Sequence, residues 1–146
     1  MLKGIPKILS PELLMVLSEM GHSDRLVISD GNFPAESMGK DAIVIRCDGH
    51  GVPELLDAIL QVFPLDTYVE HPVNLMEVMP GDDVETPIWD TYKEIIRKHD
   101  DRGDAVVGLI KRFAFYEEAK KVYAIIATGE SALYANIMLQ KGVVTD

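Results

Sequence analysis

Two residues able to bind a ligand or move a proton flank the apolar run Leu26-Val27-Ile28, with His22 before it and Asp30 after it. A histidine side chain can give and take a proton near neutral pH, and a carboxylate can orient that imidazole or accept a ligand hydroxyl. Open α/β sheets bind ligands beyond the carboxyl ends of their strands, where Asp30 is expected. The alternative is that His22 only caps helix carbonyls and Asp30 only builds a turn.

Two polar segments in the last third of the chain suit a polyhydroxy ligand. Arg112, after a strand-like run, can offer sugar hydroxyls or a carboxylate a rigid fork of donors. Tyr134-Ala135-Asn136 adds neutral donors and acceptors beside an aromatic face, a combination that suits carbohydrate. The alternatives are an Arg112 paired with Glu117 or Glu118, and a plain connection with Tyr134 packed at its edge.

Other reactive patterns are incomplete. The turn Asp48-Gly49-His50-Gly51 resembles a phosphate-binding loop, but a dinucleotide site needs a third glycine where Glu54 stands, and that carboxylate would repel a pyrophosphate. Asp48, His50 and His71 match no metal-ligand spacing. No motif frames a serine or cysteine as a nucleophile. The residues therefore indicate proton transfer or simple sugar binding, with no metal or organic cofactor expected.

The amino-acid composition excludes several classes of binding partner. The 146 residues include 24 Asp and Glu against 14 Lys and Arg, a net charge of −10, and no basic cluster suits nucleic acid or an anionic membrane. The longest stretch without charge, residues 131–140, is far shorter than the roughly 20 residues of a membrane span. Cys47 is the only cysteine and the N-terminus does not look like a signal peptide, so we expect a reducing cytoplasm.

Regular elements alternate along one expected domain, residues 1–146. Continuous apolar runs, typical of strands covered on both faces, predict strands over residues 25–29, 42–46, 73–79, 105–110 and 122–128, with a weaker one over 136–139. Helix start signals such as Ser10-Pro11 predict helices over 12–20, 53–63, 87–99 and 115–120. The expected fold is α/β: three layers, α/β/α, around a mainly parallel or mixed sheet of about six strands, in an order that these runs do not reveal.

Several segments, taken in order, carry a resemblance that covers nearly the whole chain. They are Ile8–Leu14, Met20–His22, Ser29-Asp30, Asn32–Ala35, Arg112–Glu117, Thr128–Glu130, Tyr134–Asn136 and Lys141–Val143. Together they resemble the RbsD/FucU family of sugar mutarotases. Phe33-Pro34-Ala35 and the segment from Arg112 are similar to the L-fucose mutarotase branch, whereas the ribose pyranase branch usually has a histidine in place of Arg112.

The resemblance implies roles for particular residues. His22 takes the family's proton-donor position, and Asp30, Arg112, Tyr134, Ala135 and Asn136 take its sugar-binding positions. It also implies an RbsD-like fold and a ring-shaped homo-oligomer, a decamer, with sites near subunit contacts. The chain departs from the fucose branch at Asn32 and Glu36, where that branch often has histidines, and this leaves the exact sugar open.

The expected function is therefore that of a mutarotase, which interconverts the α and β anomers of L-fucose or a similar sugar by ring opening, with His22 as general acid and base. One alternative is a pyranase that converts pyranose and furanose forms of D-ribose. Two others are a non-catalytic monosaccharide-binding protein and a purely structural oligomer subunit.

Overall fold

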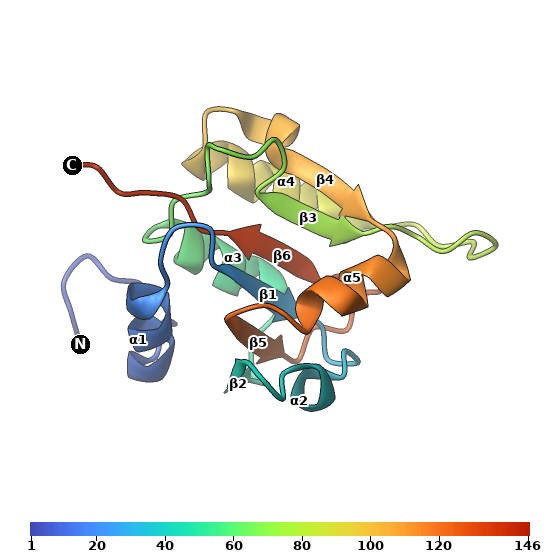
Figure 1. Cartoon of the computed structure of the whole chain (residues 1–146), viewed down its shortest axis with the longest axis horizontal. Coiled ribbons are helices and arrows are strands. Elements are labelled where there is room, and N and C mark those ends of the chain that lie inside the picture. Colours follow the sequence, from blue (N-terminus) through green and yellow to red (C-terminus); the bar gives the residue numbers. More distant parts are fainter.

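A computed structural model describes residues 1–146, in which six strands alternate with five α-helices and one short 3-10 helix (Figure 1). The elements are α1 (Pro11–Glu19), β1 (Arg25–Ser29), α2 (Ala35–Met38), β2 (Ile43–Cys47), α3 (Val52–Leu60), β3 (Val73–Met76), α4 (Pro87–His99), η1 (Gly103–Val106), β4 (Val107–Ile110), α5 (Arg112–Ala119), β5 (Ala124–Thr128) and β6 (Ile137–Gln140). The predicted α/β class is confirmed.

The six strands form one mixed sheet in the order β2-β5-β1-β6-β3-β4. All neighbouring strands pair in parallel except β6, which runs antiparallel to both β1 and β3. The carboxyl ends of the five parallel strands therefore share one edge of the sheet with the beginning of β6. The segments that follow β1, β3 and β4 and the segment that precedes β6 meet at that edge (Figure 1).

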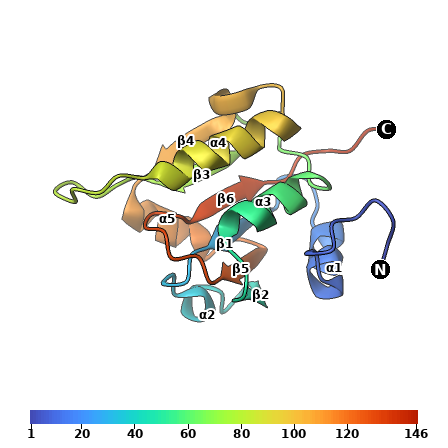
Figure 2. The same cartoon turned by 180° about the vertical axis from the view of Figure 1, so that it is seen from behind.

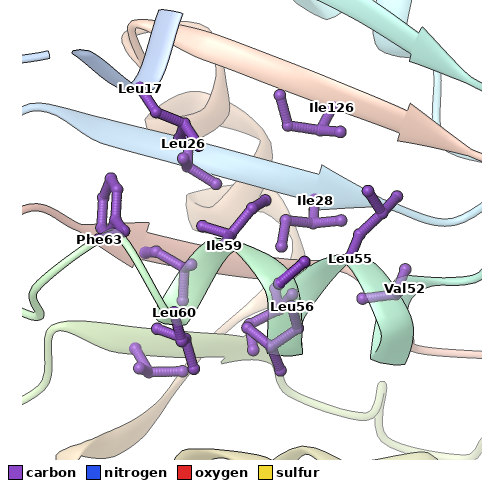
Figure 3. Packing of buried hydrophobic residues seen from close by; sticks show 14 of the residues in the cluster. Leu17, Leu26, Ile28, Val52, Leu55, Leu56, Ile59, Leu60, Phe63 and Ile126 are labelled. Carbon is purple, nitrogen blue, oxygen red and sulfur yellow. The ribbon is translucent and has the colours of Figure 1, made fainter. Parts of the chain in front are cut away.

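Helices cover both faces of the sheet. Side chains of α1, α3 and α4 pack with Leu26 and Ile28 on one face, whereas α2 and α5 pack with Val27 on the other (Figures 1 and 2). In Figure 3, Leu55 and Ile59 point from α3 toward β1, and both are fully buried. Because residues along a strand alternate between faces, the continuous apolar run of β1 serves two cores at once.

The local signals place most element ends to within about one residue. The strands predicted over 73–79, 105–110 and 122–128 are shorter, as β3, β4 and β5, and α3 ends at Leu60 instead of residue 63. The Ser10 side chain accepts a hydrogen bond from the Leu13 amide at 3.2 Å and caps α1 as expected. Helix α5 starts at Arg112 instead of residue 115, because its aromatic-alanine alternation imitates a strand. Helix α2 is one turn long and carries no periodicity that a sequence reveals. No helix combines the length and apolarity needed to cross a membrane.

Candidate functional site

A pocket of about 410 Å³ opens at the edge of the sheet where the four segments meet, a volume within the range of small-molecule sites. Four of the sequence-predicted residues, Asp30, Arg112, Tyr134 and Asn136, line it together. The complete lining is Asp30, Asn32, Phe33, Met76, Asp82, Val84, Arg112, Tyr116, Leu133, Tyr134 and Asn136.

Asp30 is half-buried and lies directly after β1. Its backbone N–H donates to Oδ1 of Asn136 at 2.8 Å, and its Oδ1 accepts from the Asn32 backbone N–H at 2.9 Å. Burial raises the pKa of Asp30, and the hydrogen bond from Asn32 opposes that rise without cancelling it. Asp30 therefore builds the turn, as the alternative had it, and also places in the pocket a carboxyl that takes up protons more readily than usual.

The Tyr134-Ala135 backbone is fixed by two aromatic donors of α4. Trp89 Nε1 donates to the Tyr134 carbonyl at 2.8 Å, and the Tyr92 hydroxyl donates to the Ala135 carbonyl at 2.7 Å. These bonds hold Tyr134 at a φ of 54°, a left-handed conformation that non-glycine residues seldom adopt. Ala135 is fully buried and, unlike the other predicted binding residues, does not line the pocket.

Arg112 stands exposed at the first position of α5. Its guanidinium carbon lies 5.6 Å from the ring centroid of Tyr116, one helical turn later, within cation–π range. The pairing with Glu117 or Glu118 is wrong, because both carboxylates pair with other cations. Sequence reasoning missed Tyr116 as a pocket residue. A helix start at Arg112 would have revealed it through the i, i+4 spacing.

His22 lies elsewhere in the chain, in the tight turn between α1 and β1, where Ser23 has a φ of 71°. Five residues of β1 separate this turn from Asp30. At about 3.3 Å a residue, the strand alone spans roughly 16 Å, several times the reach of a hydrogen bond. Within one chain, His22 is therefore not brought to the pocket with the other predicted residues.

The carboxylate beside His22 is that of Asp66, a residue absent from the sequence-based set. Oδ1 of Asp66 lies 3.1 Å from Nε2 of His22 and accepts from the Tyr68 backbone N–H at 3.0 Å, while Oδ2 accepts from Gln140 Nε2 at 2.9 Å. Asp66 is only 1% exposed. Burial by itself would raise the pKa of Asp66, but these hydrogen bonds outweigh it and hold the pKa below its usual value.

Of the two roles considered for Asp30, orienting the imidazole is wrong within one chain, because Asp66 takes that place. Asp66 belongs to the connection between α3 and β3 and lies in no recognisable motif. Its signal is tertiary: a buried carboxylate that His22 and Gln140 approach from distant segments of the chain. The His22 ring itself remains partly exposed and lies 5.0 Å from the Tyr68 ring, centroid to centroid.

The remaining polar motifs have structural roles. The Glu130 carboxylate accepts hydrogen bonds from the backbone N–H groups of Val52, Ser131 and Ala132, tying the loop after β5 to the start of α3. Gly129 allows this close approach, because a Cβ there would overlap the Asp48 carbonyl. No three or more His, Cys, Asp or Glu side chains are grouped so as to hold a metal ion.

The two departures from the fucose branch lie in different surroundings. Asn32 lines the pocket. Glu36 is on the surface, with its Oε1 3.4 Å from Nη1 of Arg46. Of the two positions, only Asn32 belongs to the pocket.

The sequence model of the RbsD / FucU transport protein family matches residues 3–144. The chain belongs to the RbsD/FucU family. This confirms the resemblance seen in the ordered segments from Ile8–Leu14 to Lys141–Val143.

Individual RbsD/FucU relatives align over nearly the full chain. The human fucose mutarotase is 51% identical, over 97% of this chain and 94% of the human one. The crystal structure of FucU from Bifidobacterium longum is 66% identical, with a TM-score of 0.96 over 98% of this chain and 100% of that one. The fucose mutarotase from Streptococcus pneumoniae, solved in complex with L-fucose, is 50% identical, with a TM-score of 0.91 over 99% and 100% of the two chains.

Proposed function

We propose that this protein is an L-fucose mutarotase, an isomerase that interconverts the α and β anomers through the open-chain aldehyde. The observation that carries the proposal is the convergence of Asp30, Arg112, Tyr134 and Asn136 on one pocket. This pocket occurs in a chain about half identical to fucose mutarotases over almost its whole length, one of which was solved with L-fucose.

The pocket's chemistry suits a neutral sugar. The oxygen of the Asn136 amide is used by the Asp30 backbone, which leaves its two N–H hydrogens to donate to sugar hydroxyls. Arg112 adds a fork of donors, and the rings of Tyr116 and Phe33 add aromatic faces against which a sugar ring can pack. A neutral ligand needs no cationic cradle, which agrees with a net charge of −10.

His22 is proposed to reach this pocket from a neighbouring copy of the chain. The length of β1 separates the two within a protomer, while the imidazole is partly exposed on the surface. Phe113 and Leu133, 72% and 57% exposed near the pocket, offer apolar surface that a neighbour can cover. The assembly is proposed to be a homodecameric ring, as the resemblance implies, and its compartment to be the cytoplasm, which the single cysteine favours.

Proton transfer follows from the His22–Asp66 pair. A carboxylate of low pKa stays ionised and accepts only, so His22 Nε2 carries the hydrogen and Nδ1 is the nitrogen that exchanges protons with the sugar. Ring opening breaks the bond between the anomeric carbon and the ring oxygen. The anomeric hydroxyl loses its proton and the ring oxygen gains one. Asp66 stabilises the imidazolium when His22 holds the extra proton.

The second proton is assigned to Asp30, because burial raises the pKa of that carboxyl. In the open-chain aldehyde, rotation about the bond next to the carbonyl presents its other face. Closure then reverses both transfers and gives the other anomer. Together His22 and Asp30 give the anomeric hydroxyl and the ring oxygen separate proton partners, and this is the acid–base arrangement that mutarotation requires.

Saturation-transfer NMR of L-fucose tests the function directly. The wild type should exchange anomers faster than buffer, His22→Ala should approach the buffer rate, and His50→Ala, a half-exposed histidine outside the pocket, should match the wild type. A panel that includes D-ribose separates the alternatives. If no sugar exchanges its ring forms faster than in buffer, the proposed enzyme activity is refuted. If only D-ribose does so, between its pyranose and furanose forms, the protein is a pyranase.

A further inference from the structure

The loop between β3 and α4, residues 77–86, leaves the body of the protein as a long excursion (Figures 1 and 2). It is tied to the pocket through the Tyr134 hydroxyl, which donates a hydrogen bond to Oδ2 of Asp82. The same hydroxyl accepts from the Met79 backbone N–H at 3.2 Å. Asp82 itself is part of the pocket lining, although the binding roles derived above leave it without a task.

The hydrogen-bonding capacity of Tyr134 is almost fully used by this loop. A phenol hydroxyl has one hydrogen to donate and two lone pairs to accept with. Asp82 takes the hydrogen and Met79 takes one lone pair, so a single lone pair remains. Toward the pocket Tyr134 is thus an acceptor and not a donor. The Asp82 carboxylate also raises the pKa of Tyr134, so that the hydroxyl keeps its hydrogen.

The position of the Tyr134 ring depends much less on Asp82. Its backbone carbonyl is held by Trp89 and the next carbonyl by Tyr92, both from α4. Without Asp82 the ring would stay near the pocket, whereas its hydroxyl would be free to rotate and to donate to a ligand. Asp82 accordingly controls the direction of one hydrogen bond.

We propose that Asp82 is a specificity-determining positioning residue: it fixes the Tyr134 hydroxyl as an acceptor, so that the pocket selects a sugar with a hydroxyl hydrogen directed at Tyr134. The inference rests on the proposed function and deepens it. It predicts discrimination against a sugar that has an acceptor without a hydrogen at that one position.

L-Fucose and a series of its deoxyfluoro analogues, each with one hydroxyl replaced by fluorine, are the probes. Fluorine keeps the size and polarity but cannot donate. For the wild type, the analogue altered at the hydroxyl facing Tyr134 should bind about tenfold more weakly than L-fucose. In Asp82→Ala, the rotated hydroxyl can donate instead, so that ratio should fall toward one. Asp83→Ala, an exposed neighbouring carboxylate outside the lining, should keep the wild-type ratio.

A double-mutant comparison tests whether Asp82 acts through Tyr134. Tyr134→Phe should abolish the same discrimination, and adding Asp82→Ala to it should change the ratio of dissociation constants no further. A ratio that is equal in Asp82→Ala and the wild type overturns the inference, as does a further loss in the double variant. Wild-type acceleration of L-fucose anomer exchange is measured in parallel. If it is absent, the proposed function fails, whatever the binding ratios show.

Discussion

Two inactive variants should restore one another if the site is built from two copies of the chain. His22→Ala removes the imidazole and keeps the pocket, whereas Arg112→Ala damages the pocket and keeps the imidazole. The roughly 16 Å length of β1 prevents His22 from serving the pocket of its own chain. A working site in a mixed assembly therefore needs the pocket of a His22→Ala chain beside the imidazole of an Arg112→Ala chain.

The expected recovery follows from chance. In an equal, random mixture, the pocket chain is the right one half of the time, and so is its neighbour, so about a quarter of the sites work when contacts are head-to-tail. The double variant His22→Ala/Arg112→Ala co-expressed with wild type is the matched control. A site between chains predicts about a quarter of wild-type activity there as well, whereas a site within one chain predicts about half.

The assay is L-fucose anomer exchange by saturation-transfer NMR, with L-fucose below its KM. The two variants are co-expressed with different affinity tags, and assemblies that carry both tags are purified in sequence. Recovery toward a quarter of wild-type kcat/KM is the expected result. If the mixed assemblies are no more active than the variants alone, while wild type with the double variant gives half, the reasoning from the length of β1 is refuted.

Two further predictions concern buried residues. Asp66→Asn should lower kcat up to about a hundredfold, because His22 loses its charged partner. Since hydrogen bonds hold the pKa of Asp66 below its usual 3.8, its carboxylate stabilises the fold above about pH 4, and this contribution is lost as pH falls through the folded pKa. Urea unfolding between pH 3 and 6 should show that the free energy of unfolding falls less steeply with decreasing pH in Asp66→Asn than in the wild type. The same pH dependence in both proteins would contradict a lowered pKa for Asp66. Leu56→Ala, fully buried, should cost about 2–5 kcal/mol of unfolding free energy, and Met15→Ala, 55% exposed, should stay within about 0.5 kcal/mol. Equal losses in these two variants would contradict the packing.

The reliable part of the sequence-based prediction was local. Continuous β-branched runs located all six strands, the strand over 25–29 to the residue, and the start signals at Ser10-Pro11 and Thr86-Pro87 located α1 and α4. Such signals arise from neighbouring residues, so they survive in a linear reading. The antiparallel placement of β6 between β1 and β3 was not visible, because strand order depends on contacts between distant segments.

The same distinction holds for the site. The polar types around Asp30, Arg112 and Tyr134 were evident from the sequence, since each follows or precedes a recognisable element. Asp66 and Asp82 were missed because each lies in a loop with no pattern, and their partners come from other parts of the chain: His22 44 positions before Asp66, and Tyr134 52 positions after Asp82.

By itself, the sequence determined which residue types can hold a neutral sugar and move its protons, and which elements carry them. Tertiary structure decided which of them meet. Asp82 and Tyr134, far apart in sequence, share a hydrogen bond because the loop after β3 and the segment before β6 meet at one edge of the sheet. His22 and Asp30, close in sequence, lie at opposite ends of β1, because an extended strand is the conformation that most separates neighbouring residues.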